Sequence, residues 1–285
     1  MKLTIVAVIL IALAAGVAGA VIYGVSRWQA KNDDFRAKLE TARISITPTT
    51  YDAREIEGLP LPVQRYFRAV LQDGQPIVAV VRLSQQGQFR ISEAEDSWRP
   101  FEATQMITTC PPGFDWDARV KMAPGVKVFV QDAYGAGTGI LHAAVLGLVT
   151  VAAMRGTPEM AQGELMRYLA EGPWYPTALL PSQGVRWEAI DDSSARATLT
   201  DGDVSVSIEF CFDEEGLITT ARSQSRYRAV DGVLQPTPWQ GRFSAYANRA
   251  GMRIPLEGEV EWQLPDGPLP YWRGRITEID YQWAQ

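Results

Sequence analysis

The strongest constraint on the fold is a single helical signal, residues 157 to 181, that lies between two long segments with the pattern of β-strands. Thr157 is suited to cap this helix, Pro158 to occupy its first position, and Gly172 with Pro173 to end it. The period of 3.6 residues predicts a buried face made of Ala161, Leu165, Tyr168 and Leu169. A helix placed between two sets of strands is expected to fill or cover one face of a sheet.

Residues 185 to 285 have the pattern of an antiparallel meander. Turn signals such as Asp201-Gly202, Asp231-Gly232 and Asp266-Gly267 separate runs in which apolar and polar residues alternate. Strands are predicted near 185–190, 195–200, 204–212, 217–229, 239–247, 252–264 and 271–283. Because short turns join antiparallel neighbours, this half of the chain is expected to form one continuous sheet.

The first half of the chain adds a helix and further strands. Residues 62 to 72 follow the period of an amphipathic helix, and a period of two begins after them. A hairpin is predicted around Gln85-Gln86-Gly87. Further strands are predicted near 101–109, 114–122 and 126–134. Residues 140 to 154 are apolar except for His142 and Thr150, and this segment is predicted to be a buried helix or a helix-strand segment.

The predicted fold class is α+β. A strongly curved antiparallel sheet, similar to half a barrel, is expected to wrap around two helices, with one transmembrane helix before it. The predicted organisation is a transmembrane anchor over residues 1–26, a stalk or linker over residues 27–50, and a single domain over residues 51–285 with a helical insertion at 140–181.

The N-terminal segment predicts membrane attachment. Residues 3 to 25 are almost entirely apolar, which is about the length that crosses the hydrocarbon core of a bilayer. A cleaved signal peptide is the alternative, since Ala18-Gly19-Ala20 resembles a cleavage site, but the apolar run continues past it and favours an anchor. Basic residues are more numerous after the span than before it, which by the positive-inside rule would place the domain in the cytoplasm. The tail before the span is too short for that rule to act strongly, and we expect a single-pass cell-membrane protein with its domain outside the cytoplasm.

Composition argues against several classes of function. A net charge of −6 does not suit a protein that binds nucleic acid by neutralising phosphates. No metal site or cofactor is expected, because the chain has one histidine, His142, and only two cysteines, Cys110 and Cys211, without the spacing of metal ligands or of a redox pair. A disulfide between these cysteines would require their strands to meet in an oxidising compartment, and Cys211 falls on the polar side of its strand.

Three residues are candidates for acid/base chemistry. Asp115 and Asp117 lie two apart on one face of a predicted strand, a spacing at which two carboxylates can share a proton or a metal ion. The alternative is a solvated face that Arg119 and Lys121 complete. His142 follows the glycine-rich segment 135–139 and is a candidate acid/base, but a lone histidine beside an apolar segment is more often packed or hydrogen-bonded.

Two groups of residues are candidates for ligand binding. The first is an aromatic group expected either to pack in the core or to line a pocket whose polar groups are Arg167, Tyr168 and His142. Its members are Phe114, Trp116, Trp174, Tyr175 and Trp239. The second is a stripe of arginines, which could bind an anion or a phospholipid headgroup or could pair with acids of a neighbouring strand. This stripe consists of Arg222, Arg226 and Arg228.

Four segments carry a resemblance to a known family: 111–125 (PPGFDWDARVKMAPG), 163–191 (GELMRYLAEGPWYPTALLPSQGVRWEAID), 238–243 (PWQGRF) and 253–276 (RIPLEGEVEWQLPDGPLPYWRGRI). With them, residues 55 to 283 resemble an uncharacterised bacterial family of membrane-anchored domains of unknown function. The order of helix, strands, helical insertion and meander is also loosely similar to the half-barrel of lipoprotein-localisation carriers and related lipid-binding envelope proteins. That topology implies a hydrophobic ligand and implies no catalytic residues.

The predicted function is therefore that of a domain attached to the membrane through residues 3–25, which binds an apolar or amphiphilic, lipid-like molecule in a cavity between sheet and helix without catalysis. One alternative is a protein-interaction module of the envelope with an unknown partner, which would present a contiguous exposed apolar patch. Another is an acid/base enzyme that uses Asp115, Asp117 or His142, which requires these side chains to converge in one cleft.

Overall fold

The computed structural model describes residues 2–92, 97–230 and 233–285. The strands of the first half are β1 (Val78–Arg90), β2 (Trp98–Thr109), β3 (Pro112–Ala123), β4 (Val126–Gly135), β5 (Thr138–Val145) and β6 (Val149–Arg155). Those of the second half are β7 (Arg186–Asp191), β8 (Ser194–Asp201), β9 (Val204–Phe212), β10 (Ile218–Val230), β11 (Val233–Arg249), β12 (Met252–Leu264) and β13 (Gly267–Trp283). The predicted turn at Asp231-Gly232 lies outside the described residues.

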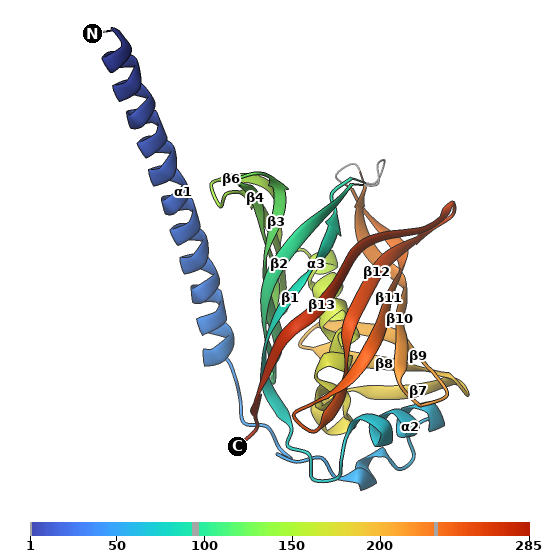
Figure 1. Cartoon of the computed structure of the whole chain (residues 1–285). Coiled ribbons are helices and arrows are strands. Elements are labelled where there is room, and N and C mark those ends of the chain that lie inside the picture. The colour runs from blue at the N-terminus through green and yellow to red at the C-terminus, as the bar shows by residue number, and fades with distance from the viewer. Residues whose placement is uncertain (1, 93–96, 231–232) are drawn as a thin grey trace.

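All thirteen described strands belong to one antiparallel sheet, in the order β6-β5-β4-β3-β2-β1-β13-β12-β11-β10-β9-β8-β7. Consecutive strands pair within β1–β6 and within β7–β13, which form two meanders, and the pairing of β1 with β13 joins these meanders. The sheet curves strongly around an interior, with β6 and β7 as its two edges (Figure 1). The predicted α+β class with a strongly curved antiparallel sheet is confirmed.

Helix α3 (Pro158–Ala170) lies inside the curve of the sheet. The predicted cap is present, since the Thr157 hydroxyl accepts a hydrogen bond from the backbone N–H of Met160 at 3.2 Å. The helix contacts β3, β4 and β5 on one side and β9 and β10 on the other. Leu165 and Leu169 are almost completely buried, so α3 links the two meanders through the shared core.

One end of the sheet is closed by helix α2 (Leu61–Val70) and by three short 3-10 turns that follow α3 (Figure 1). Tyr66 and Phe67 of α2 are fully buried, and the helix contacts β8 and β12. The 3-10 turns are Gly172–Trp174, Pro176–Leu179 and Pro181–Gln183. In them Tyr175 is fully buried and donates a hydrogen bond from its hydroxyl to the carbonyl of Tyr168 at 2.5 Å.

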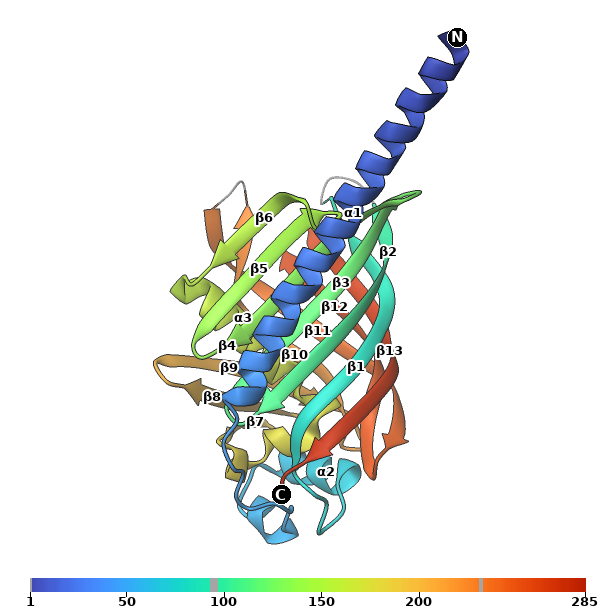
Figure 2. The ribbon, with the colours of Figure 1, turned by 90° about the vertical axis from the view of Figure 1, so that its left-hand side faces the viewer.

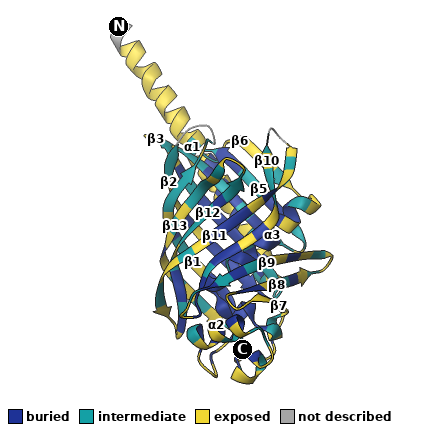
Figure 3. Ribbon diagram, turned by 90° about the vertical axis from the view of Figure 1, so that its right-hand side faces the viewer, coloured by how far each residue is buried: buried dark blue, intermediate teal, exposed yellow. Residues whose placement is uncertain are grey.

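Helix α1 (Lys2–Thr41) combines two different environments. Of the described residues, only this helix is long and apolar enough to cross a membrane, and its side chains from Thr4 to Ala20 are exposed. Its second half lies against the outer face of β2 and β3, opposite the interior (Figure 2). Trp28 and Asn32 are buried there, at 2% and 0% exposure. The exposed and buried stretches of the chain can be followed in Figure 3.

The prediction of a stalk or linker over residues 27–50 is therefore wrong up to Thr41. The charged side chains that suggested a solvated stalk instead bind the sheet, as when Arg36 Nε contacts Asp115 Oδ2 at 2.6 Å. An amphipathic helix that packs with one face against a sheet has the same composition as a polar linker, so composition did not separate them.

Two predictions for the first meander are also wrong. No turn occurs at Gln85-Gln86-Gly87, because β1 runs unbroken through these residues and pairs with β2 and β13 along its length. Residues 140–154, predicted as helical, form strand β5 and strand β6 around a turn at 146–148. Length alone cannot tell a short apolar helix from an apolar hairpin, and the helical insertion is thus confined to the region after residue 157.

A row of glycines crosses the sheet where the two meanders meet. Gly274 of β13 lies opposite Gly87 of β1 on one side and Gly258 of β12 on the other. The aromatic rings of Trp272 and Phe101 lie over Gly274 on the inner side. Glycines without side chains allow a sheet to bend sharply, and covering aromatic rings recover the lost packing.

Candidate functional site

A cavity of about 260 Å³ lies between α3 and the inner face of the sheet. Five of the nine tryptophans and two tyrosines contribute to its wall, so it is largely apolar. These rings are Trp116, Trp174, Trp239, Trp262, Trp272, Tyr227 and Tyr271. A concave, mostly apolar space with a few polar groups is the usual form of a small-molecule site, and this one is slightly smaller than the pockets that hold drug-sized ligands.

The main polar cluster of the cavity centres on Arg167 of α3. Its guanidinium forms ion pairs with Asp132 of β4 and with Glu171, the latter at 2.7 Å from Nε. Gln105 Nε2 donates a further hydrogen bond to Glu171 at 2.6 Å. The guanidinium also lies 5.1 Å from the centre of the Trp116 ring. Because both acids share one cation and the groups are largely buried, the cluster fixes α3 against the first meander.

A second polar group, Glu164, lies one turn earlier on the same helix. Its side chain is 5% exposed, and Oε2 has no hydrogen-bond partner among the described residues. Burial raises the pKa of Glu164 well above the ordinary value of 4.5, and the charge and hydrogen bond of Asp132 raise this pKa further, whereas the charges of Arg226 and Arg167 lower it. The cavity therefore favours the uncharged form of this carboxyl group, one oxygen of which is unsatisfied.

Replacing Glu164 with glutamine is expected to stabilise the fold relative to wild type, and this gain should become larger as the pH rises. The carboxyl ionises near pH 4.5 in the unfolded chain but at a higher pH in the fold, so the fold loses stability as the pH rises above 4.5 towards the raised pKa. The neutral amide removes this loss. Thermal unfolding at pH 5, 7 and 9 should show that the midpoint of Glu164→Gln exceeds that of wild type by an amount that grows with pH. A difference in midpoint that is the same at all three pH values would contradict the prediction.

The seven predicted ligand-binding residues lie in three places. Trp116, Trp174 and Trp239 line the cavity, and Arg167, named as a polar partner, lines it too. Phe114, Tyr168 and Tyr175 are buried in the surrounding core instead. The remaining one, His142, lies on the outer face of β5, where its ring stacks on Trp28 of α1 at 4.9 Å. Strand alternation explains this separation, because His142 points away from Leu141, which faces the cavity.

The three candidates for acid/base chemistry lie together beneath α1, and each is engaged by this helix. Asp115 accepts hydrogen bonds from Arg36 at 2.6 Å and Gln131 at 2.8 Å, and Asp117 accepts one from Trp28 Nε1 at 2.8 Å. His142 Nδ1 lies 3.0 Å from the amine of Lys31. The interpretation of Asp115 and Asp117 as a solvated face is wrong, because α1 covers them to 0% and 8% exposure.

Several residues of the cavity were not predicted to line it, and Arg226, which was predicted as part of an arginine stripe on one face of the sheet, is the clearest case. The pattern placed it on one stripe with Arg222, but a β-bulge between Ser223 and Arg226 reverses the alternation of β10. Arg222 consequently stays outside, 3.8 Å from Glu209, while Arg226 lines the cavity. No feature of the local sequence predicts this bulge. Trp262 and Trp272 also line the cavity, and the alternation of apolar residues along their strands places both on the inner face.

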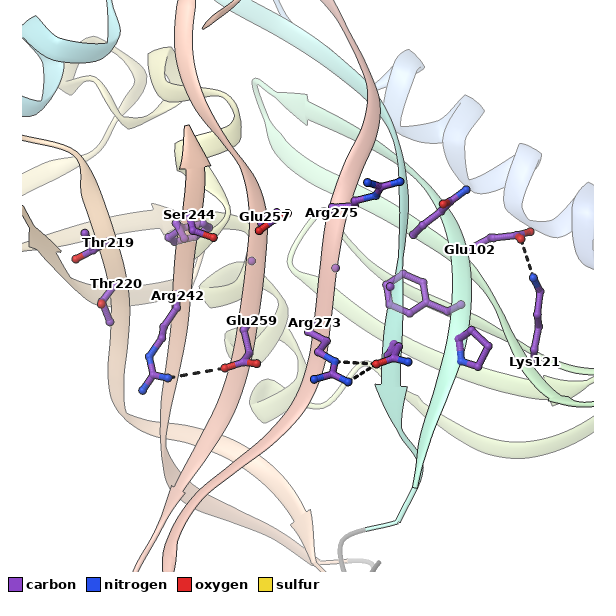
Figure 4. A pocket seen from close by; sticks show the side chains of 18 residues that line it. Glu102, Lys121, Thr219, Thr220, Arg242, Ser244, Glu257, Glu259, Arg273 and Arg275 are labelled. Carbon is purple, nitrogen blue, oxygen red and sulfur yellow. Dashed lines mark hydrogen bonds and ion pairs between the residues drawn. The ribbon is translucent and has the colours of Figure 1, made fainter. Parts of the chain in front are cut away.

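A larger, open groove of about 940 Å³ lies on the outer face of the sheet, over the glycine row (Figure 4). Most of its charged side chains bind neighbours on adjacent strands. Lys121 contacts Glu102 at 2.9 Å, and Arg273 donates to Gln88 at 2.8 Å from Nε. Such pairs are ordinary on the solvent face of a sheet and need no ligand.

The two cysteines, Cys110 after β2 and Cys211 on β9, are free thiols in the structure. Among the described residues, no group of three or more His, Cys, Asp and Glu side chains is arranged to hold a metal ion.

Comparison with known proteins gives one family and two solved structures that align at low similarity. None of the curated proteins matches the chain. A LolA superfamily protein from Nitrosomonas europaea aligns with a TM-score of 0.41 and 13% identity over 78% of this chain and 92% of that one. A beta-barrel-like protein of the domain of unknown function DUF1849 from Brucella abortus aligns with a TM-score of 0.16 and 10% identity over 72% and 99%. Residues 57–281 match the model of a family of unknown function, DUF6920, which confirms the predicted resemblance, and the chain belongs to this family.

Proposed function

We propose that this protein is a membrane-anchored domain that binds a single-chain amphiphile in the cavity between α3 and the sheet. The observation that carries the proposal is the cavity itself, whose wall of tryptophan rings also contains unsatisfied polar atoms. Trp174 Nε1 and Glu164 Oε2 are buried without hydrogen-bond partners in the described part of the chain. A purely apolar occupant would leave these groups unpaired, whereas an amphiphile supplies polar atoms along with an apolar chain.

The position of α1 supports attachment to a membrane. The apolar run ends at Val25, and Gly24 already touches the turn between β5 and β6, close to Leu146 and Leu148. The helix therefore passes from its exposed apolar half to the surface of the domain without an intervening linker. A domain held in this way keeps the hairpin ends near α1 close to the bilayer surface, from which an amphiphile enters (Figure 1).

Photolabelling tests this function. The full chain, in nanodiscs of phosphatidylcholine, is irradiated with a diazirine-bearing fatty alcohol and separately with the matching fatty acid, and labelled peptides are identified by mass spectrometry. We expect label on the cavity wall, in α3 and in β12, as well as on residues 3–25, which lie in the bilayer. Label restricted to residues 3–25 for both probes would contradict the proposal.

Filling the cavity gives a sharper version of this test. Gly163 lies in the middle of α3, lines the cavity, and has no atom within 4 Å of the position that a Cβ would occupy. Gly163→Phe is expected to remove labelling of the cavity wall while maintaining or raising the thermal midpoint, because glycine is a poor helix former. Gly163→Ala is the matched control, with a gain of about 1 kcal/mol in stability and retained labelling. Full labelling in the phenylalanine variant would place the ligand elsewhere.

One observation favours the alternative of a protein-interaction module. Edge strand β6 exposes Val149 and Val151, at 64% and 57%, beside the exposed Leu148 of the preceding turn. An exposed apolar edge strand is a surface on which another protein can pair. Crosslinking in the native membrane that recovers one protein through β6, combined with no label in the cavity, would favour this function.

A further inference from the structure

The bulge in β10 directs Arg226 into the cavity, which Arg228, two residues further along the strand, also lines. Ser223 pairs with Trp239, but Arg226 pairs with Thr237, so one extra residue is inserted between the two pairs. Without that insertion, Arg226 would share the outer face with Arg222, as its spacing of four predicts. Bulges frequently re-aim a side chain at a functional site.

The re-aimed arginine lies among hydrogen-bond donors. Its guanidinium is 5.0 Å from the centre of the Trp239 ring, and Trp239 Nε1 donates a hydrogen bond to the Tyr271 hydroxyl at 2.9 Å. No described acceptor takes the proton of that hydroxyl, and no described carboxylate lies within ion-pair distance of Arg226. Because the indole occupies the oxygen of Tyr271 as an acceptor, its O–H is left to donate into the cavity together with the guanidinium.

The acids of the cavity leave room for a negative ligand. Asp132 and Glu171 are both bound to Arg167. Glu164 faces Arg226 from α3, and burial raises its pKa, which favours the uncharged form, although the charge of Arg226 opposes this rise. The region around Arg226 and Tyr271 therefore offers a cation and a hydroxyl donor, while the neighbouring acids Asp132 and Glu171 are compensated by Arg167.

We infer that the ligand is an anionic amphiphile whose carboxylate or phosphate group binds Arg226 and the Tyr271 hydroxyl while its chain lies along the tryptophan wall. This inference rests on the proposed function and specifies its ligand. Carboxylate and phosphate share the chemistry that a guanidinium recognises, namely two or more acceptor oxygens on one negative group. Free fatty acids and phosphate-bearing lipids are the two sources of such a group.

The test compares probes of different charge on four forms of the full chain in phosphatidylcholine nanodiscs. The probes are the diazirine-bearing fatty acid and fatty alcohol. Unlabelled dodecyl phosphate, dodecanoate and dodecyltrimethylammonium compete with the acid. The forms are wild type, Arg226→Gln, Arg226→Lys and Arg222→Gln, the last being a matched control on the same strand but outside the cavity. Comparing forms in identical nanodiscs cancels the partitioning of each amphiphile into the bilayer.

For wild type, we expect the acid to label the cavity wall about tenfold or more above the alcohol, and dodecyl phosphate but not the ammonium compound to displace it. If dodecyl phosphate displaces the acid probe less effectively than unlabelled dodecanoate does, the site prefers a carboxylate. If dodecyl phosphate displaces it more effectively, the site prefers a phosphate. Arg226→Gln should abolish the preference for the acid over the alcohol, and Arg226→Lys should retain part of it. Arg222→Gln should show the same preference as wild type.

Two results would overturn the inference, and they are distinguishable. If the alcohol labels the cavity as well as the acid, or if Arg226→Gln keeps the preference, the cavity binds amphiphiles but does not select an anion. If neither probe labels the cavity wall in wild type, the proposed function itself fails. Thermal midpoints close to wild type for both glutamine variants ensure that a loss of label reflects binding rather than unfolding.

Discussion

Replacing Arg36 with alanine is expected to destabilise the domain by about 3 kcal/mol, the lower end of the range for breaking a buried ion pair. Asp115 is completely buried, whereas the side chain of Arg36 keeps 22% exposure. Without the guanidinium, the carboxylate is left beneath α1 with Gln131 as its remaining side-chain donor. An uncompensated buried charge accounts for most of the expected loss.

The pH dependence of this loss provides its signature. Burial already raises the pKa of Asp115, and the positive charge of Arg36 opposes that rise. Removing Arg36 leaves the pKa of Asp115 in the folded state higher still, so the deficit should be larger at pH 8 than at pH 4, because a falling pH protonates the buried carboxyl and relieves its unpaired charge. Thermal unfolding of the full chain in nanodiscs measures it. Lys38→Ala is the matched control, since the Lys38–Asp34 pair on the same helix is largely exposed. Equal effects of the two substitutions would show that α1 does not hold the sheet through Asp115.

The second large effect is expected at the glycine row. A methyl group on Gly87 would collide with the backbone oxygen of Arg273 and with the ring of Phe101. The backbone cannot withdraw, because β1 and β13 are hydrogen-bonded on both sides of this point. Gly87→Ala is therefore expected to cost at least about 3 kcal/mol through overpacking and to separate the only strand pair that joins the two meanders in the described chain.

Gly258→Ala provides the comparison within the same row. A methyl group there would lie 3.4 Å from the backbone oxygen of Arg242, close to ordinary contact, so a change below about 1 kcal/mol is expected. Both variants are measured by chemical denaturation and by far-ultraviolet circular dichroism. If Gly87→Ala is as mild as Gly258→Ala, the sheet is less tightly bent at this point than the structure indicates.

Both predictions concern features that stabilise the sheet around the cavity but do not form its wall. Arg36 and its neighbours fix α1 on the outer face, and the glycine row bends the sheet so that the inner face surrounds α3. Loss of either feature is expected to reduce labelling of the cavity wall together with stability, whereas Arg226→Gln is expected to change selectivity alone.

The sequence by itself determined the local elements. Alternation and turn signals predicted all seven strands of the second half, with both bounds correct for 204–212 and 252–264, although β11 begins at Val233 and β13 at Gly267, before the predicted 239 and 271. The cap at Thr157 marked the start of α3 correctly. Local hairpins depend on contacts between neighbours in the chain, and such contacts leave a periodic pattern. The pattern also identified Trp116, Trp174 and Trp239, which line the cavity.

Only the tertiary structure decided the pairing of β1 with β13, the docking of the second half of α1, and the direction of Arg226. The first two join residues far apart in sequence, such as Trp28 and Asp117, and no periodicity records a partner so distant. The third depends on one extra residue in β10, which inverts the alternation beyond it without altering the composition of the strand. The helix at Thr157 was recognisable in the chain, whereas the space beside it arises only when both meanders close around it.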